Sequence, residues 1–143
     1  MPLLEDLNSL NYYQISGPKS LGLEWVVENF HETIKNYDNN INDILRTLVE
    51  HAALQISETL NQYGNGQVLL SGGGTYNDFF IKILTQHSNS KFIIPSKPII
   101  DYKEALIFGF LGVLKLRNEI NCMKSVTGAS KNHSTGEIYE IIK

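Results

Sequence analysis

Apolar side chains recur at helical spacing over residues 41–62, which gives the clearest pattern in the chain. Asp38-Asn39-Asn40 precedes this stretch and offers capping side chains, and Gly64-Asn65-Gly66 follows it. The pattern predicts a helix about 33 Å long at 1.5 Å per residue. Its apolar members are Ile41, Ile44, Leu45, Leu48, Val49, Ala52, Ala53, Ile56 and Leu60.

A second apolar stripe predicts a helix that begins at Ser20. Its members recur every three to five residues, and they are Leu21, Trp25, Val26, Phe30 and Ile34. Residues 1–19 read as a lead-in segment, in which residues 12–15 favour an extended conformation. We therefore expect residues 20–143 to form one domain behind this segment.

Between residues 67 and 94 the sequence pattern alternates between short β-prone runs, a glycine-rich turn and one helical stretch. Residues 67–71 are short, apolar and β-prone, three glycines follow at 72–74, a helical pattern covers 77–84, and residues 91–94 form a second β-prone run. This order predicts one βαβ unit with parallel strands and a right-handed crossover.

A third helical pattern runs from Asp101 to about Ile120, and its many apolar residues predict that most of its surface is buried. The tail from Asn121 is predicted to be mostly irregular. Three long helices accompany only two strands, and a two-stranded sheet is a poor core by itself. The predicted fold is a helix-rich α/β protein that belongs to a larger sheet.

Composition and charge narrow the classes of function. The chain has 143 residues, a net charge of −3 and a pI of about 5.8, so it lacks the basic excess that binds nucleic acid. No apolar run reaches the roughly 18 residues of a membrane span, and the start is not typical of a signal peptide. Cys122 is the one cysteine, which favours a reducing compartment. We expect a cytoplasmic protein with no nucleic-acid or membrane partner.

The glycine loop Gly72-Gly73-Gly74 is the leading candidate for ligand binding. Glycine lets backbone approach a ligand closely, and the following helix start attracts phosphate. The loop matches neither common phosphate-binding motif, so the pattern alone favours a plain strand-to-helix turn without a ligand over a nucleotide site. Asn77 stands at the start of the next helix, where it serves either as a cap or at the edge of a nucleotide site.

Asp101 and Glu104 have two interpretations as well. They form a capping box at the start of the third helix, or Glu104 lies near a substrate. The four histidines are scattered and include no pair at i and i+4, so no metal site is predicted. Cys122 lacks a local sequence context typical of a nucleophile.

Five segments in order resemble one family. They are Lys19-Ser20-Leu21-Gly22-x-Glu24-Trp25, Ile44-Leu45-x-Thr47-Leu48, Gly72-Gly73-Gly74-x-x-Asn77, Glu104-Ala105-Leu106-x-Phe108-x-x-Leu111 and Ser125-Val126-Thr127-Gly128-Ala129. Together they resemble the C-terminal half of anhydro-N-acetylmuramic acid kinases. That family shares the ribonuclease-H-like lobes of sugar kinases, Hsp70-type chaperones and actin.

The resemblance implies a function for each candidate residue. Gly72, Gly73 and Gly74 would lie against the adenosine and phosphates of ATP, Asn77 at the edge of that site, and Glu104 near the sugar. The family enzyme opens the 1,6-anhydro ring with water and phosphorylates O6, with Mg²⁺ assisting, in the recycling of cell-wall sugar.

The family enzyme is more than twice as long, and its N-terminal part carries the catalytic aspartate, the first phosphate loop and most sugar contacts. We therefore expect this chain to act with an N-terminal lobe or partner chain, and to lack catalysis alone, because general-base chemistry needs a carboxylate within reach. A stand-alone regulatory or protein-binding module is one alternative, and another ATPase of the superfamily is a second. A homodimer is compatible with the sequence.

Overall fold

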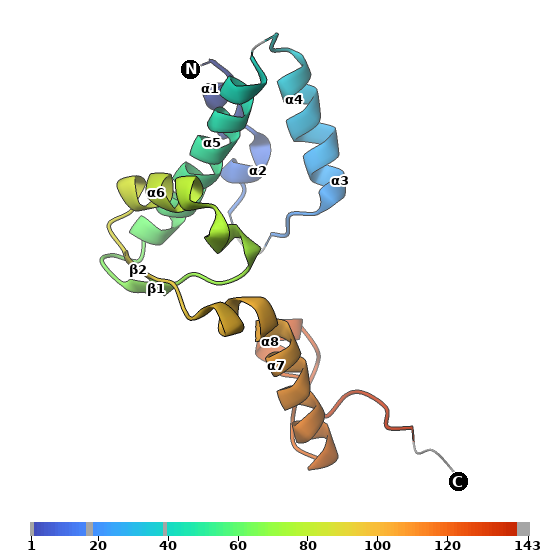
Figure 1. Cartoon of the computed structure of the whole chain (residues 1–143). Coiled ribbons are helices and arrows are strands. Elements are labelled where there is room, and N and C mark those ends of the chain that lie inside the picture. Colours follow the sequence, from blue (N-terminus) through green and yellow to red (C-terminus); the bar gives the residue numbers. More distant parts are fainter. Residues whose placement is uncertain (1, 17–18, 39, 140–143) are drawn as a thin grey trace. The chain divides into compact units, whose positions relative to one another are not determined.

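A computed structural model describes residues 2–16, 19–38 and 40–139 (Figure 1). By its internal contacts the chain divides into two compact units, Met1–Pro95 and Ser96–Lys143. The predicted boundary between a lead-in segment, residues 1–19, and one domain, residues 20–143, stays a prediction.

Two short helices open the first unit. Helix α1 (Pro2–Asn8) buries Leu3 and Leu7 and packs against α5, and α2 (Asn11–Gln14) follows it. The extended conformation predicted for residues 12–15 is wrong over 12–14. The rings of Tyr12 and Tyr13 both contact Trp25, with centroids 5.0 and 6.4 Å away. Neighbouring side chains of a strand point to opposite faces, so this shared contact favours the helical turn.

The helix predicted from Ser20 is present but begins at Leu23. It consists of α3 (Leu23–Trp25), a π-helical segment η1 (Val26–His31) and α4 (Glu32–Lys35). Trp25 and Phe30 turn toward the rest of the unit, where their rings contact each other at 5.6 Å. Phe30 lies within the wide η1 turn and Trp25 directly before it, and π-helical turns of this kind often occur at sites with a special packing or function.

Helix α5 (Ile41–Asn61) confirms the strongest sequence pattern. The Asn40 side chain accepts a hydrogen bond from the Asn42 amide at 2.9 Å, which caps the helix as predicted. Gly64 follows the end of the helix with a positive φ of 81°. Asn39, part of the predicted break, lies outside the described residues.

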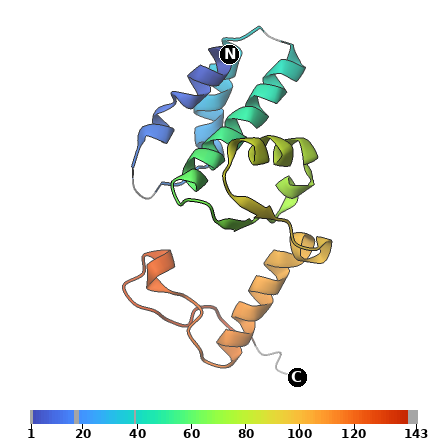
Figure 2. The same cartoon turned by 90° about the vertical axis from the view of Figure 1, so that its left-hand side faces the viewer.

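Of the residues that α5 buries most deeply, Ala53 alone belongs to the apolar stripe that predicts the helix. The buried residues of α5 are Thr47, His51, Ala53 and Ser57. Ile41 and Leu45, by contrast, are 63% and 53% exposed. Helix α5 lies between α1 and α6 and contacts both (Figure 2), so two neighbouring helices rather than one stripe determine what it buries.

The βαβ unit is present as predicted. Strand β1 (Gln67–Leu69) leads to a 3-10 turn η2 (Gly73–Tyr76), α6 (Asp78–His87) and β2 (Lys91–Ile93). The strands are parallel, with Val68 opposite Phe92. The prediction of a helix-rich α/β protein with a small parallel sheet is thus confirmed, while a ribonuclease-H-like lobe stays a prediction.

The core of the first unit lies where α5 and α6 meet one face of this sheet. Its fully buried members are Ala53, Ile83 and Leu84, against which Val49, Leu70, Phe80 and Phe92 pack. On the strands, Leu69 and Ile93 alternate with the inward residues and are 63% and 39% exposed. The first unit therefore covers one face of its sheet and leaves apolar groups on the other.

The second unit is built around α7 (Lys97–Leu116), which begins four residues before the predicted start. Ser96 occupies the N-cap position and Pro98 the first turn, where proline is favoured. The prediction that most of α7 is buried is wrong. Of its described residues only Ile100 is buried, because few other elements of this unit are available to cover it.

The predicted irregular tail contains one short helix and one closed loop. Helix α8 (Lys124–Thr127) ends at Gly128, which has a φ of 73°. The backbones of Cys122 and His133 exchange two hydrogen bonds of 3.0 Å and close the loop around α8. Residues 140–143 lie outside the described part.

Candidate functional site

The glycine loop leaves the carboxyl end of β1 and turns directly into η2. Gly72 has a φ of 98° and a ψ of 171°, a conformation that only glycine adopts readily. The backbone amide of Thr75 donates to the Gly72 carbonyl at 3.0 Å, and its hydroxyl donates to the same oxygen at 2.7 Å. These two bonds fix the turn, so the conformation of the loop is set locally.

Gly73 and Gly74 lie on the outer side of this turn. Both are exposed, and a Cβ atom built on either of them would meet no other atom within 4 Å. Packing within the chain therefore does not require glycine at these two positions. The open space in front of them is room in which a ligand can approach the backbone.

Asn77 is the N-cap of α6. Its Oδ1 accepts a hydrogen bond from the Phe80 amide at 3.0 Å. This hydrogen bond confirms that Asn77 caps the helix. A role beside a nucleotide is untested. Asp78 follows in the first turn, where its charge already interacts favourably with the positive end of the helix dipole. An anion bound at the start of α6 would therefore be repelled by the Asp78 carboxylate while it is attracted by the helix dipole.

Glu104 lies in the second turn of α7, inside the helix and on its exposed surface. The capping box predicted for Asp101 and Glu104 is wrong, because the helix starts at Lys97 and Asp101 instead forms an ion pair with Lys97 at 2.8 Å. The four residues Gly72, Gly73, Gly74 and Asn77 share one turn of the first unit, whereas Glu104 belongs to the second unit.

A buried polar network around His51 escaped the sequence analysis. His51 is 2% exposed, its Nδ1 lies 2.7 Å from Oδ1 of Asn8, and its Nε2 lies 2.8 Å from the Tyr13 hydroxyl. The Asn8 oxygen also accepts from Gln55 at 3.1 Å. Since Oδ1 can only accept, Nδ1 carries the proton and the tyrosine hydroxyl donates to Nε2.

The surroundings of His51 keep it neutral. Burial lowers the pKa of His51 from 6.5 to about 4, and burial together with the neighbouring Tyr12 raises the pKa of Tyr13. The rings of Tyr13 and Phe30 pack against the imidazole with centroids 5.1 and 5.2 Å away. Because its partners come from α1 and α2, the network fastens both N-terminal helices to α5, and no local sequence pattern signals it.

A second polar cluster joins α5 to α6. Glu50 Oε1 lies 2.6 Å from His87 Nε2, and Arg46 Nη2 lies 3.3 Å from the other carboxylate oxygen. The hydrogen bond with His87, followed by that with Arg46, lowers the pKa of Glu50, although desolvation acts in the opposite direction. The Arg46 guanidinium also lies over the Phe79 ring, 4.9 Å from its centroid. This cluster fixes the packing of the helix that follows the glycine loop.

The part of the chain that the structure describes contains neither a metal-binding cluster nor a membrane-spanning helix. Among these residues no group of three His, Cys, Asp or Glu side chains is arranged to hold a metal ion. Within the same residues, no helix combines the length and apolar character needed to cross a bilayer. The glycine loop is therefore the candidate that the sequence and the geometry share.

The fold and the loop define the class of protein: a helix-rich α/β protein with an open glycine turn at the carboxyl end of a parallel strand. The family model described as anhydro-N-acetylmuramic acid kinase matches residues 1–141. The chain therefore belongs to the anhydro-N-acetylmuramic acid kinase family.

Individual relatives agree with this assignment. An anhydro-N-acetylmuramic acid kinase of Sulfurovum sp. (strain NBC37-1) is 34% identical over 144 residues, which cover 96% of this chain and 39% of the relative. One from Legionella pneumophila (strain Lens) is 31% identical, with 99% and 40% covered. One from Vibrio parahaemolyticus serotype O3:K6 (strain RIMD 2210633) is 29% identical, with 96% and 39% covered. The chain thus spans about two fifths of the length of the curated relatives it matches.

Proposed function

We propose that this chain supplies the C-terminal, adenosine-binding lobe of an ATP-dependent anhydro-N-acetylmuramic acid kinase. The single observation that carries the proposal is the family match over residues 1–141, within which the open glycine turn lies at the carboxyl end of β1. Ligands of open α/β sheets bind at this end of the strands.

In this proposal the backbone of Gly72, Gly73 and Gly74 approaches the adenosine and phosphates of ATP. Asn77 orders the start of α6 at the edge of that site, and Glu104 faces the sugar. Mg²⁺ would neutralise charge on the phosphates, and phosphoryl transfer depends mainly on such positioning and charge stabilisation. This chain contributes the surface for one end of the nucleotide.

The partner in this proposal is the additional part that the relatives possess, about three fifths of their length. The reaction requires a general base and a cleft that excludes water. We therefore expect weak ATP binding and no phosphorylation of the anhydro-sugar by the 143-residue chain alone. Robust turnover by the purified chain would contradict this part of the proposal.

The glycine loop can be tested by Gly73→Val. Gly73 has no positive φ and a Cβ there meets open space, so the fold should persist while the side chain blocks the approach of ATP. Gly66→Val is the matched control, because Gly66 has the same freedom outside the loop. We expect ATP-dependent amide NMR shifts at residues 72–77 in the wild type and the control, and their loss in Gly73→Val. Equal ATP affinity in all three proteins would restore the plain-turn interpretation.

One observation favours a second candidate function, a protein-binding module derived from the kinase. Leu106, Phe108 and Phe110 of α7 are 69%, 70% and 60% exposed within a unit that does not cover them. Large exposed apolar surfaces mark protein interaction sites. Stable binding of a partner unrelated to the kinase, together with an absence of ATP shifts, would favour this candidate.

A further inference from the structure

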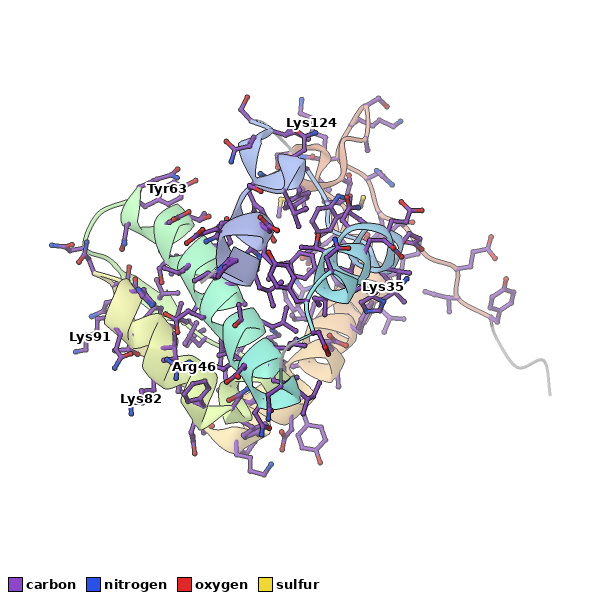
Figure 3. All side chains as sticks on the ribbon, turned by 90° about the horizontal axis from the view of Figure 1, so that it is seen from above. Lys35, Arg46, Tyr63, Lys82, Lys91 and Lys124 are labelled. Carbon is purple, nitrogen blue, oxygen red and sulfur yellow. The ribbon has the colours of Figure 1, made fainter. Side chains whose placement is uncertain are left out.

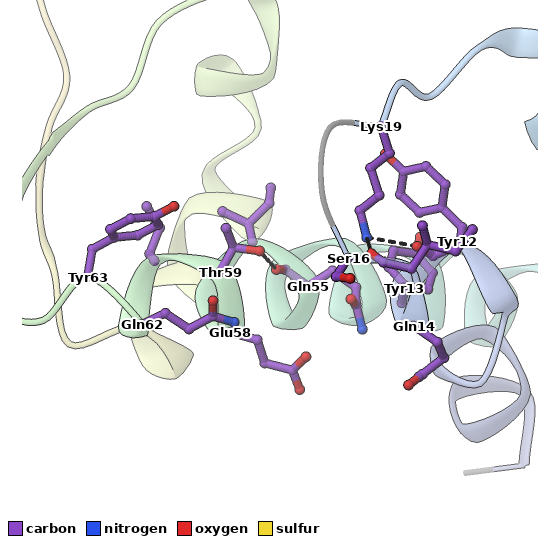
Figure 4. A pocket seen from close by; sticks show the side chains of 13 residues that line it. Tyr12, Tyr13, Gln14, Ser16, Lys19, Gln55, Glu58, Thr59, Gln62 and Tyr63 are labelled. Carbon is purple, nitrogen blue, oxygen red and sulfur yellow. Dashed lines mark hydrogen bonds between the residues drawn. The ribbon is translucent and has the colours of Figure 1, made fainter.

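A cleft of about 750 Å³ lies beside the C-terminal half of α5 (Figure 4). Residues 12–16 and Lys19 form one wall, and residues from Gln55 to Tyr63, in α5 and just beyond its end, form the other. Ligand pockets commonly enclose roughly 300–1,000 Å³. No lining residue belongs to the glycine loop, so the cleft is a separate site within the first unit.

The helical side of the cleft is rich in groups that hydrogen-bond without carrying charge. Gln55 donates from Nε2 to Asn8, so its carbonyl oxygen can accept from another group. The Thr59 hydroxyl donates to the backbone carbonyl of Gln55 at 2.9 Å, so its oxygen can then only accept. Gln14 and Gln62 add amide donors and acceptors along the same cleft. These groups suit a ligand with many hydroxyls, each of which both donates and accepts.

The charges of the cleft balance. Lys19 directs Nζ to the carbonyls of Tyr12 and Ile15, at 2.8 and 3.0 Å, and lies 4.6 Å from the centroid of the Tyr12 ring. An ammonium group has three protons, so one remains for a ligand. Among the described lining residues Glu58 is the other charged one, and it carries the opposite sign. The cleft therefore has no net formal charge to attract an anionic nucleotide.

Aromatic rings stand at both ends of the cleft. Tyr12 lies beside Lys19, and Tyr63 is 85% exposed at the end of α5, where Figure 3 shows it at the rim of the unit. Aromatic rings combine a broad apolar face with a polar tip. A sugar ring has apolar C–H faces and a hydroxylated edge, so it matches rings that flank a row of amides.

We propose that this cleft binds an uncharged saccharide of one or two rings. The polar positions from Gln55 to Gln62 span about 10 Å along the helix, which leaves room for a short saccharide rather than a long polymer. The proposal does not depend on the function of the glycine loop, since the two sites share no residue. It adds to the chain a sugar site remote in sequence from Glu104.

The test is an amide NMR titration of the 143-residue chain with N,N′-diacetylchitobiose and with N-acetylglucosamine. We expect saturable shifts at residues 14–16, 19 and 55–63. Tyr63→Ala should weaken binding roughly fivefold, the factor that corresponds to about 1 kcal/mol of ring contact. Gln62→Ala should weaken it roughly threefold through a lost hydrogen bond. Tyr102→Ala is the matched control, because Tyr102 is an exposed tyrosine, at 68%, outside the cleft.

Three results would overturn the inference. The first is the absence of saturable shifts in the cleft with either sugar at about 50 mM, a concentration above any useful affinity. The second is an equal loss of affinity in Tyr63→Ala and Tyr102→Ala. The third is N-acetylmuramic acid binding more than about tenfold tighter than the neutral sugars, which would show that charge dominates. ATP reports at residues 72–77, so the failure of this site and the failure of the proposed kinase function are distinguishable.

Discussion

Acidification should destabilise the chain through one buried group, His51. The imidazole is neutral in the folded state, where it donates to Asn8 and accepts from Tyr13. Its pKa falls from 6.5 to about 4 on folding, because burial disfavours the charged form. Below the unfolded pKa the unfolded chain takes up a proton that the folded chain excludes. Stability is therefore complete above 6.5 and is lost as the pH falls toward 4.

The magnitude follows from the two pKa values of His51. Each unit of difference corresponds to about 1.4 kcal/mol, so the whole window from 6.5 to about 4 contains roughly 3 kcal/mol. Between about pH 7.5 and about pH 5 the expected loss is roughly 2 kcal/mol, because the folded state is still largely unprotonated at the lower value. A loss of this size is a large fraction of the usual stability of a domain.

The assay is urea unfolding across this pH range, followed by circular dichroism, for the wild type and His51→Gln. Glutamine retains a donor and an acceptor but does not titrate, so the variant should lose stability with acid by about 2 kcal/mol less than the wild type. The matched control is His31→Gln, which removes an exposed histidine of η1 and should leave the wild-type slope unchanged. Parallel stability curves for the wild type and His51→Gln would refute the assignment of a neutral, buried imidazole.

Three further predictions concern the loop and the helix behind it. Gly72→Ala should destabilise the first unit by about 1–2 kcal/mol because of its φ of 98°, whereas Gly73→Ala should change stability by less than about 0.5 kcal/mol, as thermal unfolding would show. Asn77→Ala should cost about 1 kcal/mol through the lost cap, and Asn77→Ser should restore most of it. Glu50→Gln should flatten the acid limb of stability below pH 4.5, because a carboxylate with a lowered pKa stabilises the fold above 4.5 and loses that contribution as the pH falls through the folded value. An unchanged acid limb would contradict the contact with His87.

Local sequence patterns were sufficient to predict those elements for which the apolar period, the capping residue and the turn residues all indicate the same structure. Helix α5 combines an apolar period, an Asn40 cap and a glycine end, and the βαβ unit combines two β-prone runs with a glycine turn. Where two local signals competed, the prediction failed. Asp101 and Glu104 resemble a capping box, yet Ser96 and Pro98 provide an earlier helix start. The earlier start is adopted because it adds one more hydrogen-bonded turn to α7.

Of the candidate site, only the backbone turn at the glycines could be predicted from the sequence. The three glycines indicated a turn of unusual conformation, and the structure assigns positive φ to Gly72 alone of the three. The His51 network could not be predicted, since its partners lie 43 and 38 residues away in the sequence. The cleft beside α5 depends in the same way on how residues 12–16 and Lys19 lie against α5. Such contacts follow from tertiary packing, which no periodicity encodes.

The conformation of the glycine loop and the uncovered sheet face are physically separable. The loop is held by Thr75, by the Asn77 cap and by the α5–α6 core, all within the first unit. The opposite face of the sheet presents Leu69 and Ile93, and a two-stranded sheet is marginal without further partners. A partner that covers Leu69 and Ile93 would therefore stabilise the sheet without reshaping the loop. It follows that the proposed nucleotide surface can be preformed in this chain, independently of any partner that covers the sheet.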